Sequence, residues 1–384
     1  MFGRQLGLLV VILTASVGCG RHGPSINSPI KPGPREIDEV TVAERRSMLD
    51  RAEVWQPVNP GKLDLLAGPD GDGAFEFDAH VTCSFDYPDK PASGATPKFD
   101  CALTPKDVVK VKYGLENGEV FAEVAASRLF WALGFFADRM YPVKVTCLDC
   151  PSDPYRASGV DWALGRPGDV GMRTYEFAAI ERKFGGKDIE VPTFEGWSWR
   201  ELEDIADNGV GASRAHIDAL KLLAAFIQHV DSKPGNQALV CPKSEVTRDA
   251  QGNETCENPM LVVKDLGSSF AAASRMRFVK MNLGSWRSVR IWRDERACRA
   301  ELTSSFVGTL GHPLISEPGR KFLAERLSLL SDKQIEDIFT ASRVERRNEK
   351  MDGRRVTVAD WVEVFKAKRD QIVNHRCDRS TDNP

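Results

Sequence analysis

The stretch SRAHIDALKLLAAFIQHVDSKPGN, residues 213–236, decides how the rest of the chain is organised. Apolar residues recur at three- and four-residue spacing over residues 217–227, which predicts an amphipathic helix. A Pro-Gly pair then forces a polar loop. Two β-rich runs follow, 237–241 and 260–264, and the second leads into Asp265-Leu266-Gly267. The order is therefore helix, polar loop, strand, strand and acidic turn.

The polar residues of this stretch suit phosphoryl transfer, which depends on positioning and charge neutralisation more than on covalent help. A carboxylate at Asp231 can orient a hydroxyl nucleophile and accept its proton, and Lys233 can reach a γ-phosphate. Asn236 and Asp265 supply the oxygen ligands that Mg²⁺ prefers. The loop at 231–236 and the turn at 265–267 could each, taken alone, be an ordinary polar turn without any function. The interpretation therefore depends on the upstream half of the chain.

With its H-x-D-x-K-x-x-N loop and its D-x-G turn, the chain resembles the catalytic core of the protein-kinase-like superfamily. The upstream loop at 93–98, S-G-A-T-P-K, resembles the S-G-x-x-P-K loop of HipA-type kinases. This resemblance implies that Gly94 and Lys98 bind nucleotide phosphates. A hairpin turn without any ligand is the alternative.

The resemblance extends to a lysine and a glutamate. Lys112 takes the position of the strand lysine that holds the α- and β-phosphates in kinases. The predicted helix at 118–135 places Glu123 where that lysine's ion-pair partner lies, and Glu119 is the alternative if the register is shifted. An edge strand carrying lysines for solubility is the other interpretation of Lys112. Residues 178–183 are the candidate hinge against which adenine would stack.

The N-terminus predicts export. Arg4 precedes an apolar run at 6–17 that is too short to span a bilayer, and small residues precede Cys19. We expect a signal peptide over 1–18 and a membrane anchor through a lipidated Cys19, with an ordinary secretion signal as the alternative. The proline-rich residues 19–40 predict an extended tether.

The eight cysteines other than Cys19 form an even number, which indicates disulfides in an oxidising compartment. We expect nearest pairs: Cys83–Cys101, Cys147–Cys150, Cys241–Cys256 and Cys298–Cys377. The C-x-x-C at 147–150 could instead belong to a zinc site or a redox pair. The net charge is −3 over 384 residues. The chain therefore lacks the overall positive charge that would indicate nucleic acid as a partner.

Taken together, the sequence predicts an α+β fold that is bilobal and protein-kinase-like, with a β-rich N-lobe containing one key helix and a mainly helical C-lobe. The expected boundaries are an N-terminal helix at 41–57, the N-lobe at 58–191, the C-lobe at 192–378 and a disordered tail at 379–384.

The resemblance implies an ATP- and Mg²⁺-dependent phosphotransferase acting on an unidentified protein, sugar or lipid hydroxyl. Its expected location is the outer membrane or the cell surface, as a lipoprotein facing the periplasm or the exterior. Because free ATP is scarce outside the cytoplasm, two alternatives stay open. One is a catalytically inactive kinase-like binding or scaffold lipoprotein, and the other is an AMP transferase on the same fold.

Overall fold

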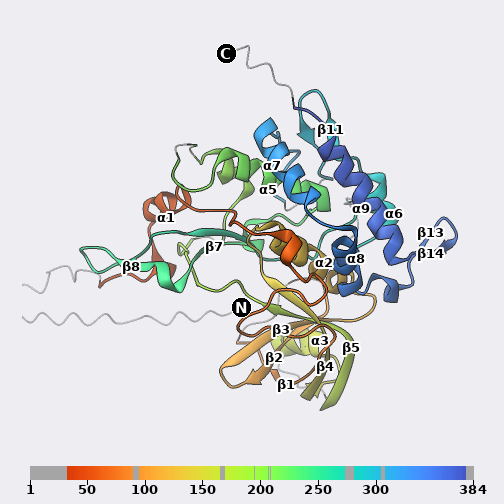
Figure 1. The fold of residues 1–384 in the computed structure, drawn as a ribbon. Helices are drawn as coiled ribbons and strands as arrows, with labels where there is room; N and C mark the ends of the chain where they lie inside the picture. The colour runs from red at the N-terminus through yellow and green to blue at the C-terminus, as the bar shows by residue number, and fades with distance from the viewer. Residues whose placement is uncertain are drawn as a thin grey trace, which may run out of the picture.

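The chain is α+β, as its sequence predicts (Figure 1). The computed structural model describes residues 33–377 except 90–93, 95, 165–168, 194, 206, 208, 273–280 and 304–307. The predicted signal peptide, Cys19 and the tail at 379–384 therefore lie outside the described residues. The strands β1–β5 gather at one end of the molecule, helices α5 to α9 lie toward the other end, and α2 lies between them (Figure 1).

Five strands close into a barrel in the order β1-β2-β3-β5-β4. All neighbours are antiparallel except β1 and β4, whose parallel pairing closes the barrel. Alternating apolar residues from these strands fill the interior with a core of its own. The barrel strands are β1 (His80–Asp86), β2 (Lys98–Thr104), β3 (Asp107–Tyr113), β4 (Arg139–Pro151) and β5 (Val170–Arg182).

Helix α2 (Gly118–Leu133) runs against the barrel and is buried along nearly its whole length. The Asn117 side chain accepts a hydrogen bond from Glu119 N–H at its start. Gly134 ends the helix with φ of 87°, a left-handed conformation that favours glycine. The predicted helix at 118–135 thus has the expected position and nearly the expected end.

The predicted helix at the centre of the sequence is α5 (Arg214–Ile227), capped by the Ser213 side chain. Two strands after it, β7 and β10, join the earlier β6 in a three-stranded sheet with the order β10-β7-β6. Its strands are β6 (Lys187–Asp188), β7 (Gln237–Cys241) and β10 (Met260–Val263). Both predicted strands after the loop are therefore present, and they pair antiparallel.

The remaining elements complete the helical part and its attachments. A second, larger core joins α2 and α5 to the C-terminal helices. The helices are α1 (Val42–Leu49), α3 (Pro154–Ser158), α4 (Val160–Ala163), α6 (Leu283–Ser288), α7 (Glu317–Ser328), α8 (Asp332–Ala341) and α9 (Val358–Val373). The short strands are β8 (Val246–Arg248), β9 (Glu254–Cys256), β11 (Trp292–Asp294), β12 (Arg299–Ala300), β13 (Lys350–Met351) and β14 (Arg354–Arg355).

Two expectations for the N-terminal region are wrong. The tether prediction fails for its described part, because residues 37–39 form a short 3-10 helix, η1 (Ile37–Glu39), and Ile37 is buried. Proline content predicted an extended chain, but the apolar side chains beyond the prolines pack into the main core. The expected helix at 41–57 is shorter, since α1 ends at Leu49 although its capping box at Thr41 is present.

All four predicted disulfides are confirmed: Cys83–Cys101, Cys147–Cys150, Cys241–Cys256 and Cys298–Cys377. Cys147 and Cys150 pair with each other, so the zinc interpretation of this C-x-x-C does not hold in this oxidised structure. Four disulfides are typical of proteins from an oxidising, exported environment. Among the described residues, no helix combines the length and the apolar character needed to cross a bilayer.

Candidate functional site

The loop after α5 places Asp231, Lys233 and Asn236 beside one another. Lys233 Nζ lies 2.9 Å from Asp231 Oδ2, and Asn236 Nδ2 donates to the Asp231 carbonyl at 2.7 Å. Among the described residues, the buried Asp231 atom Oδ1 has no hydrogen-bond partner. A short 3-10 turn, η4 (Pro234–Asn236), shapes this loop because proline fixes its own φ at the first position. The polar groups of this loop are thus held together by their own hydrogen bonds.

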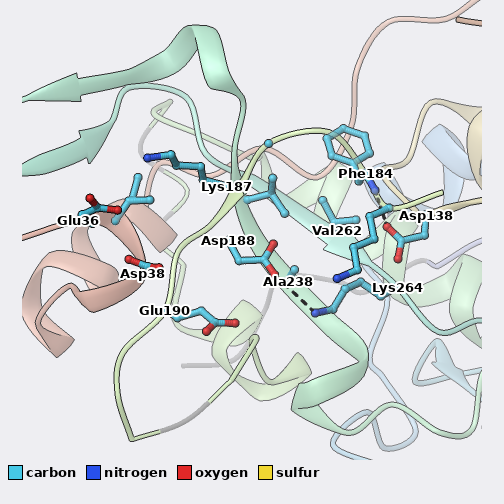
Figure 2. A pocket seen from close by; sticks show the side chains of 14 residues that line it. Glu36, Asp38, Asp138, Phe184, Lys187, Asp188, Glu190, Ala238, Val262 and Lys264 are labelled. Carbon is cyan, nitrogen blue, oxygen red and sulfur yellow. Dashed lines mark hydrogen bonds and ion pairs between the residues drawn. The ribbon is translucent and has the colours of Figure 1, made fainter. Parts of the chain in front are cut away.

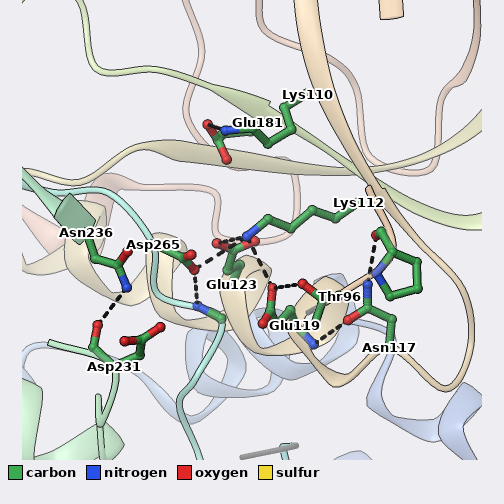
Figure 3. A network of polar contacts seen from close by, with 12 residues as sticks. Thr96, Lys110, Lys112, Asn117, Glu119, Glu123, Glu181, Asp231, Asn236 and Asp265 are labelled. Atoms are coloured by element: carbon green, nitrogen blue, oxygen red, sulfur yellow. Dashed lines mark hydrogen bonds and ion pairs between the residues drawn. The ribbon is translucent and has the colours of Figure 1, made fainter. Parts of the chain in front are cut away.

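The strand pairing brings Asp265 to the same loop. The Asn236 carbonyl accepts hydrogen bonds from Lys264 N–H at 2.9 Å and from Asp265 N–H at 3.4 Å. Asp265 Oδ1 in turn accepts from Gly267 N–H at 3.2 Å, which fixes the Asp-Leu-Gly turn. Figure 3 shows Asp231, Asn236 and Asp265 as close neighbours in space.

Lys112 lies at the centre of a cluster of carboxylates (Figure 3). It is only 2% exposed, and its Nζ lies 2.7 Å from Glu123 Oε1. It also lies 3.4 Å from Asp265 Oδ1 and 3.4 Å from Glu119 Oε2. Glu123, the expected partner, therefore makes the shortest contact, and Glu119 joins it from one turn earlier on α2. The cluster ties β3, α2 and the Asp-Leu-Gly turn together.

The electrostatics of the cluster favour a charged Lys112 and a charged Asp265, whereas burial raises the pKa of Glu123 well above its ordinary value. Burial opposes a charge on Lys112, but Asp265 and the two glutamates outweigh it and raise the pKa of Lys112 well above its ordinary value. Burial likewise opposes ionisation of Asp265, yet Lys112, a side-chain hydrogen bond with Glu123 and the Gly267 N–H hold the pKa of Asp265 below its usual range. Asp265 is therefore an anion at neutral pH.

The loop before β2 lies close to this cluster. Gly94 has φ of 98°, and a Cβ built there would approach Lys98 Nζ to 2.8 Å. Lys98 pairs with Lys112 across the β2–β3 register. Burial and the neighbouring Lys112 lower the pKa of Lys98. Thr96 Oγ1 donates to Glu119 Oε2 at 2.7 Å, so this loop is tied to α2. Ser93 and Ala95 of the same motif lie outside the described residues.

A cavity of about 420 Å³ lies beside Lys264, the residue before Asp265 (Figure 2). Its floor is the face of the three-stranded sheet that carries Ala238, Val240 and Val262. The linker after β5 forms a wall that includes Phe184. This volume is of the size that small-molecule sites commonly have.

Asp138 lines the cavity, and sequence reasoning did not identify it. It is buried, accepts a hydrogen bond from Phe184 N–H at 2.6 Å, and burial raises its pKa to about 7. Asp138 follows α2 in a connection that carries no motif, so only its neighbours in space reveal it.

Sequence reasoning also missed the ion pair of Lys110 Nζ with Glu181 Oε1, 3.1 Å apart. The attraction of Glu181 is the main cause that raises the pKa of Lys110. The alternation of β3 placed Lys110 on the same face as Lys112. The partner of Lys110, however, is set by the β3–β5 register, which only the folded sheet reveals.

Comparisons with known proteins add little. No family model matches the chain, and no curated protein matches it. A proinflammatory kinase from Helicobacter pylori, CtkA, is similar among solved structures at 10% identity and a TM-score of 0.39. The match covers 78% of this chain and 95% of that chain. A TM-score this low does not establish a shared fold.

Proposed function

We propose that this chain is a bilobal, protein-kinase-like phosphotransferase that uses ATP and Mg²⁺. The observation that carries the proposal is the convergence of Lys112, Glu123 and Asp265 beside a loop that holds Asp231 and Asn236. These groups come from β3, α2, the β10 turn and the loop after α5, so the folded chain assembles them from distant segments. Such an assembly of one cation, carboxylates and an amide suits a nucleotide–metal site.

Each residue has a role that follows from its position. Lys112, held by Glu123, would bind the nucleotide phosphates, and Gly94 and Lys98 would cover them from the β2 side. Asp265 and the Asn236 side-chain oxygen would hold Mg²⁺. Asp231, with Oδ1 unpartnered, would orient the acceptor hydroxyl and take its proton. Lys233 would neutralise charge on the transferred group. When bound, Mg-ATP would supply that phosphoryl group.

The cavity beside Lys264 would hold the nucleobase, between the sheet face at Ala238 and Val262 and the linker after β5. The earlier expectation for the hinge, residues 178–183, coincides with the end of β5 and the start of this linker. The acceptor would be a hydroxyl group on a protein, sugar or lipid. We further propose that the chain is an exported lipoprotein anchored through Cys19.

Melting temperatures with and without Mg-ATP test the nucleotide site. We expect the wild type to melt higher with Mg-ATP, because a ligand at 100 times its Kd stabilises the folded state by about 2.7 kcal/mol. Lys112→Met and Asp265→Ala should lose this shift. Lys144→Met, at a half-exposed position on β4, is the matched control and should keep it.

One observation favours a second candidate, a binding protein that uses no nucleotide. Lys112 is surrounded by three carboxylates in the structure and needs no phosphate to balance its charge. A folded wild type that ignores Mg-ATP would support this candidate and contradict the enzyme. If the shift is present, the mass of the labelled acceptor distinguishes phosphoryl transfer from transfer of AMP.

A further inference from the structure

The chain that follows α9 meets the turn between β11 and β12 at three possible metal ligands, which are Cys298, His375 and Cys377 (Figure 1). Their ligand atoms, two sulfurs and one ring nitrogen, all lie within 4.8 Å of one another. His375 Nε2 is 3.3 Å from Cys298 Sγ. Both cysteines are buried and the histidine is half-buried. Two thiolates and one imidazole are a ligand set typical of Zn²⁺.

The two cysteines are joined to each other in this structure, so a metal can bind them only after reduction. The thiolate is the form of cysteine that binds metals. A dithiol breaks the Sγ–Sγ bond by thiol–disulfide exchange: the protein gains two electrons and two protons as two thiols, and the dithiol becomes a disulfide. Zn²⁺ then displaces one proton from each thiol.

Hydrogen bonds independent of the disulfide hold both cysteines in place. The Cys298 carbonyl accepts from Ile315 N–H at 2.9 Å. Cys377 N–H donates to Glu317 Oε2 at 2.8 Å. Glu317 is the first residue of α7 and is itself held by Arg320, whose Nη2 lies 2.7 Å from Glu317 Oε1. The two sulfurs therefore stay close together when the bond between them is reduced, which gives the ion a site with its ligands already within reach.

The His375 ring is positioned by Trp292, since the two ring centroids lie 4.5 Å apart. Trp292 Nε1 donates to the Gln371 carbonyl at 2.9 Å, which fixes the indole against α9. His375 Nε2 also lies 3.1 Å from the Glu295 carbonyl, to which the ring donates when Nε2 carries the hydrogen. The tautomer with its hydrogen on Nδ1 presents the Nε2 lone pair to a metal beside Cys298. The same ring position therefore serves both the disulfide and a metal.

A cavity of about 600 Å³ reaches His375 and is also lined by Glu317 and Arg320. It gives an ion a path from solvent to the ring nitrogen. Three protein ligands leave the fourth position of a tetrahedral zinc ion open, and a water molecule can fill that position.

We propose that reduction of the Cys298–Cys377 disulfide creates a Zn²⁺ site formed by Cys298, His375 and Cys377, with water as the fourth ligand. The bound ion keeps the residues after α9 attached to the β11–β12 turn while the covalent link is open. Among the described residues, none of the other six paired cysteines belongs to such a group of three ligands. The site shares no residue with the proposed nucleotide site, so the proposal goes beyond that function and does not depend on it.

Protection of individual thiols from alkylation tests the site. The full chain is reduced with dithiothreitol, freed of it without air, and treated with iodoacetamide at increasing Zn²⁺, and peptide masses report each cysteine. Zn²⁺ should protect Cys298 and Cys377 at concentrations that leave Cys241 and Cys256 unprotected. His375→Gln keeps both thiols and should raise the zinc needed by about 100-fold or more, because loss of even a group beyond the metal ligands commonly costs 10- to 100-fold in affinity.

His80→Gln, at an exposed position on β1, is the matched control and should leave the zinc requirement unchanged. Circular dichroism in the near ultraviolet verifies that the reduced chain is folded. The proposal is overturned if a folded His375→Gln variant needs no more zinc than the wild type. Protection of Cys241 and Cys256 at the same zinc concentration as Cys298 and Cys377 would also overturn it, because two thiols without a histidine would then suffice.

A second variant covers the case in which the reduced chain unfolds. Cys298→Asp needs no reductant and leaves the other three disulfides intact. Asp suits position 298, where φ is 49°, because it adopts the left-handed conformation more readily than most residues, and its carboxylate can bind zinc. Zn²⁺ should raise the melting temperature of Cys298→Asp, but not that of Cys298→Asp combined with His375→Gln. A folded Cys298→Asp variant whose melting temperature ignores Zn²⁺ would contradict the proposal.

Discussion

Lys112 is the residue whose surroundings differ most from those of an ordinary strand lysine. Its nearest carboxyl group belongs to Glu123, which is 1% exposed, while Glu119 is 17% exposed and lies farther away. Removing one partner of a buried ion pair leaves the other charge buried without compensation, which costs more than removing a partner that water can replace.

We therefore expect Glu123→Gln to lower the free energy of unfolding by about 2 kcal/mol or more, and Glu119→Gln by less than about 1 kcal/mol. Both substitutions preserve side-chain shape, so each serves as the control for the other. Urea denaturation at pH 7 measures the difference. Equal losses would mean that the two carboxylates share the lysine evenly, contrary to the distances.

His229, two residues before Asp231, predicts a pH dependence of stability. It is fully buried, neither ring nitrogen has a hydrogen-bond partner in the part of the chain that the structure describes, and burial lowers its pKa to about 4. The unfolded chain binds the proton near pH 6.5, so the neutral ring's contribution is complete above that pH. It is lost as pH falls from about 6.5 to about 4, by about 3 kcal/mol in total. A His229→Leu variant should lose less stability over this range in denaturant titrations, whereas an unchanged pH profile would exclude His229 as the source.

The site residues show what sequence can and cannot predict at this scale. Motif spacing placed Asp231 and Asn236 on one loop because they are five residues apart, and the pairing of the two predicted strands after that loop brings Asp265 to it. Lys112 and Glu123 were paired only through the family resemblance. Asp138 was missed because it lies beside the end of β10, where its N–H donates to the Val263 carbonyl, and the residues around Asp138 in the sequence give no sign of that neighbour.

At the scale of elements, the helices with periodic apolar residues were predicted well, and their first or last residues coincide with capping residues. Helix α2 ends at Gly134, and α9 begins at the capping box of Thr357 and Asp360, as the sequence indicates. Residues 35–40 were predicted to belong to an extended tether because the prediction gave more weight to the prolines than to Ile37 and Val40. Burial of Ile37 and Val40 depends on core surface from distant segments, which no window of sequence contains.

Gly134, at the end of α2, allows a specific prediction about stability at this scale. Besides its positive φ, a Cβ there would lie 2.3 Å from the Gln56 carbonyl oxygen. Gly134→Ala should therefore cost about 2–4 kcal/mol, from left-handed strain and from a clash with backbone that cannot easily move. Gly71→Ala is the matched control, since φ there is 98° but nothing lies within 4 Å. It should cost about 1 kcal/mol, and similar losses at both positions would contradict the role of the close contact.

At the scale of the whole molecule, the barrel and the helices are held together by contacts that cross between them. Arg343, just after α8, donates to the carbonyl of Ala178 in β5 at 2.5 Å and to that of Val143 in β4 at 3.3 Å. Burial lowers the pKa of Arg343 to about 10, so it remains charged at neutral pH. This contact and the shared core on α2 limit movement of the barrel against the helices.

The disulfides act on the same scale, and their loop lengths rank their effects. Cys298 and Cys377 are 79 residues apart, whereas Cys241 and Cys256 are 15 apart. In the chain-entropy model, the longer loop contributes about 4.5 kcal/mol and the shorter one about 3 kcal/mol. Replacing both cysteines of each pair by serine should therefore destabilise the 298–377 variant more, as measured by urea denaturation of the otherwise oxidised protein. The reverse order would mean that the Cys241–Cys256 bond stabilises the folded chain beyond loop closure, by holding the β8–β9 hairpin against β7.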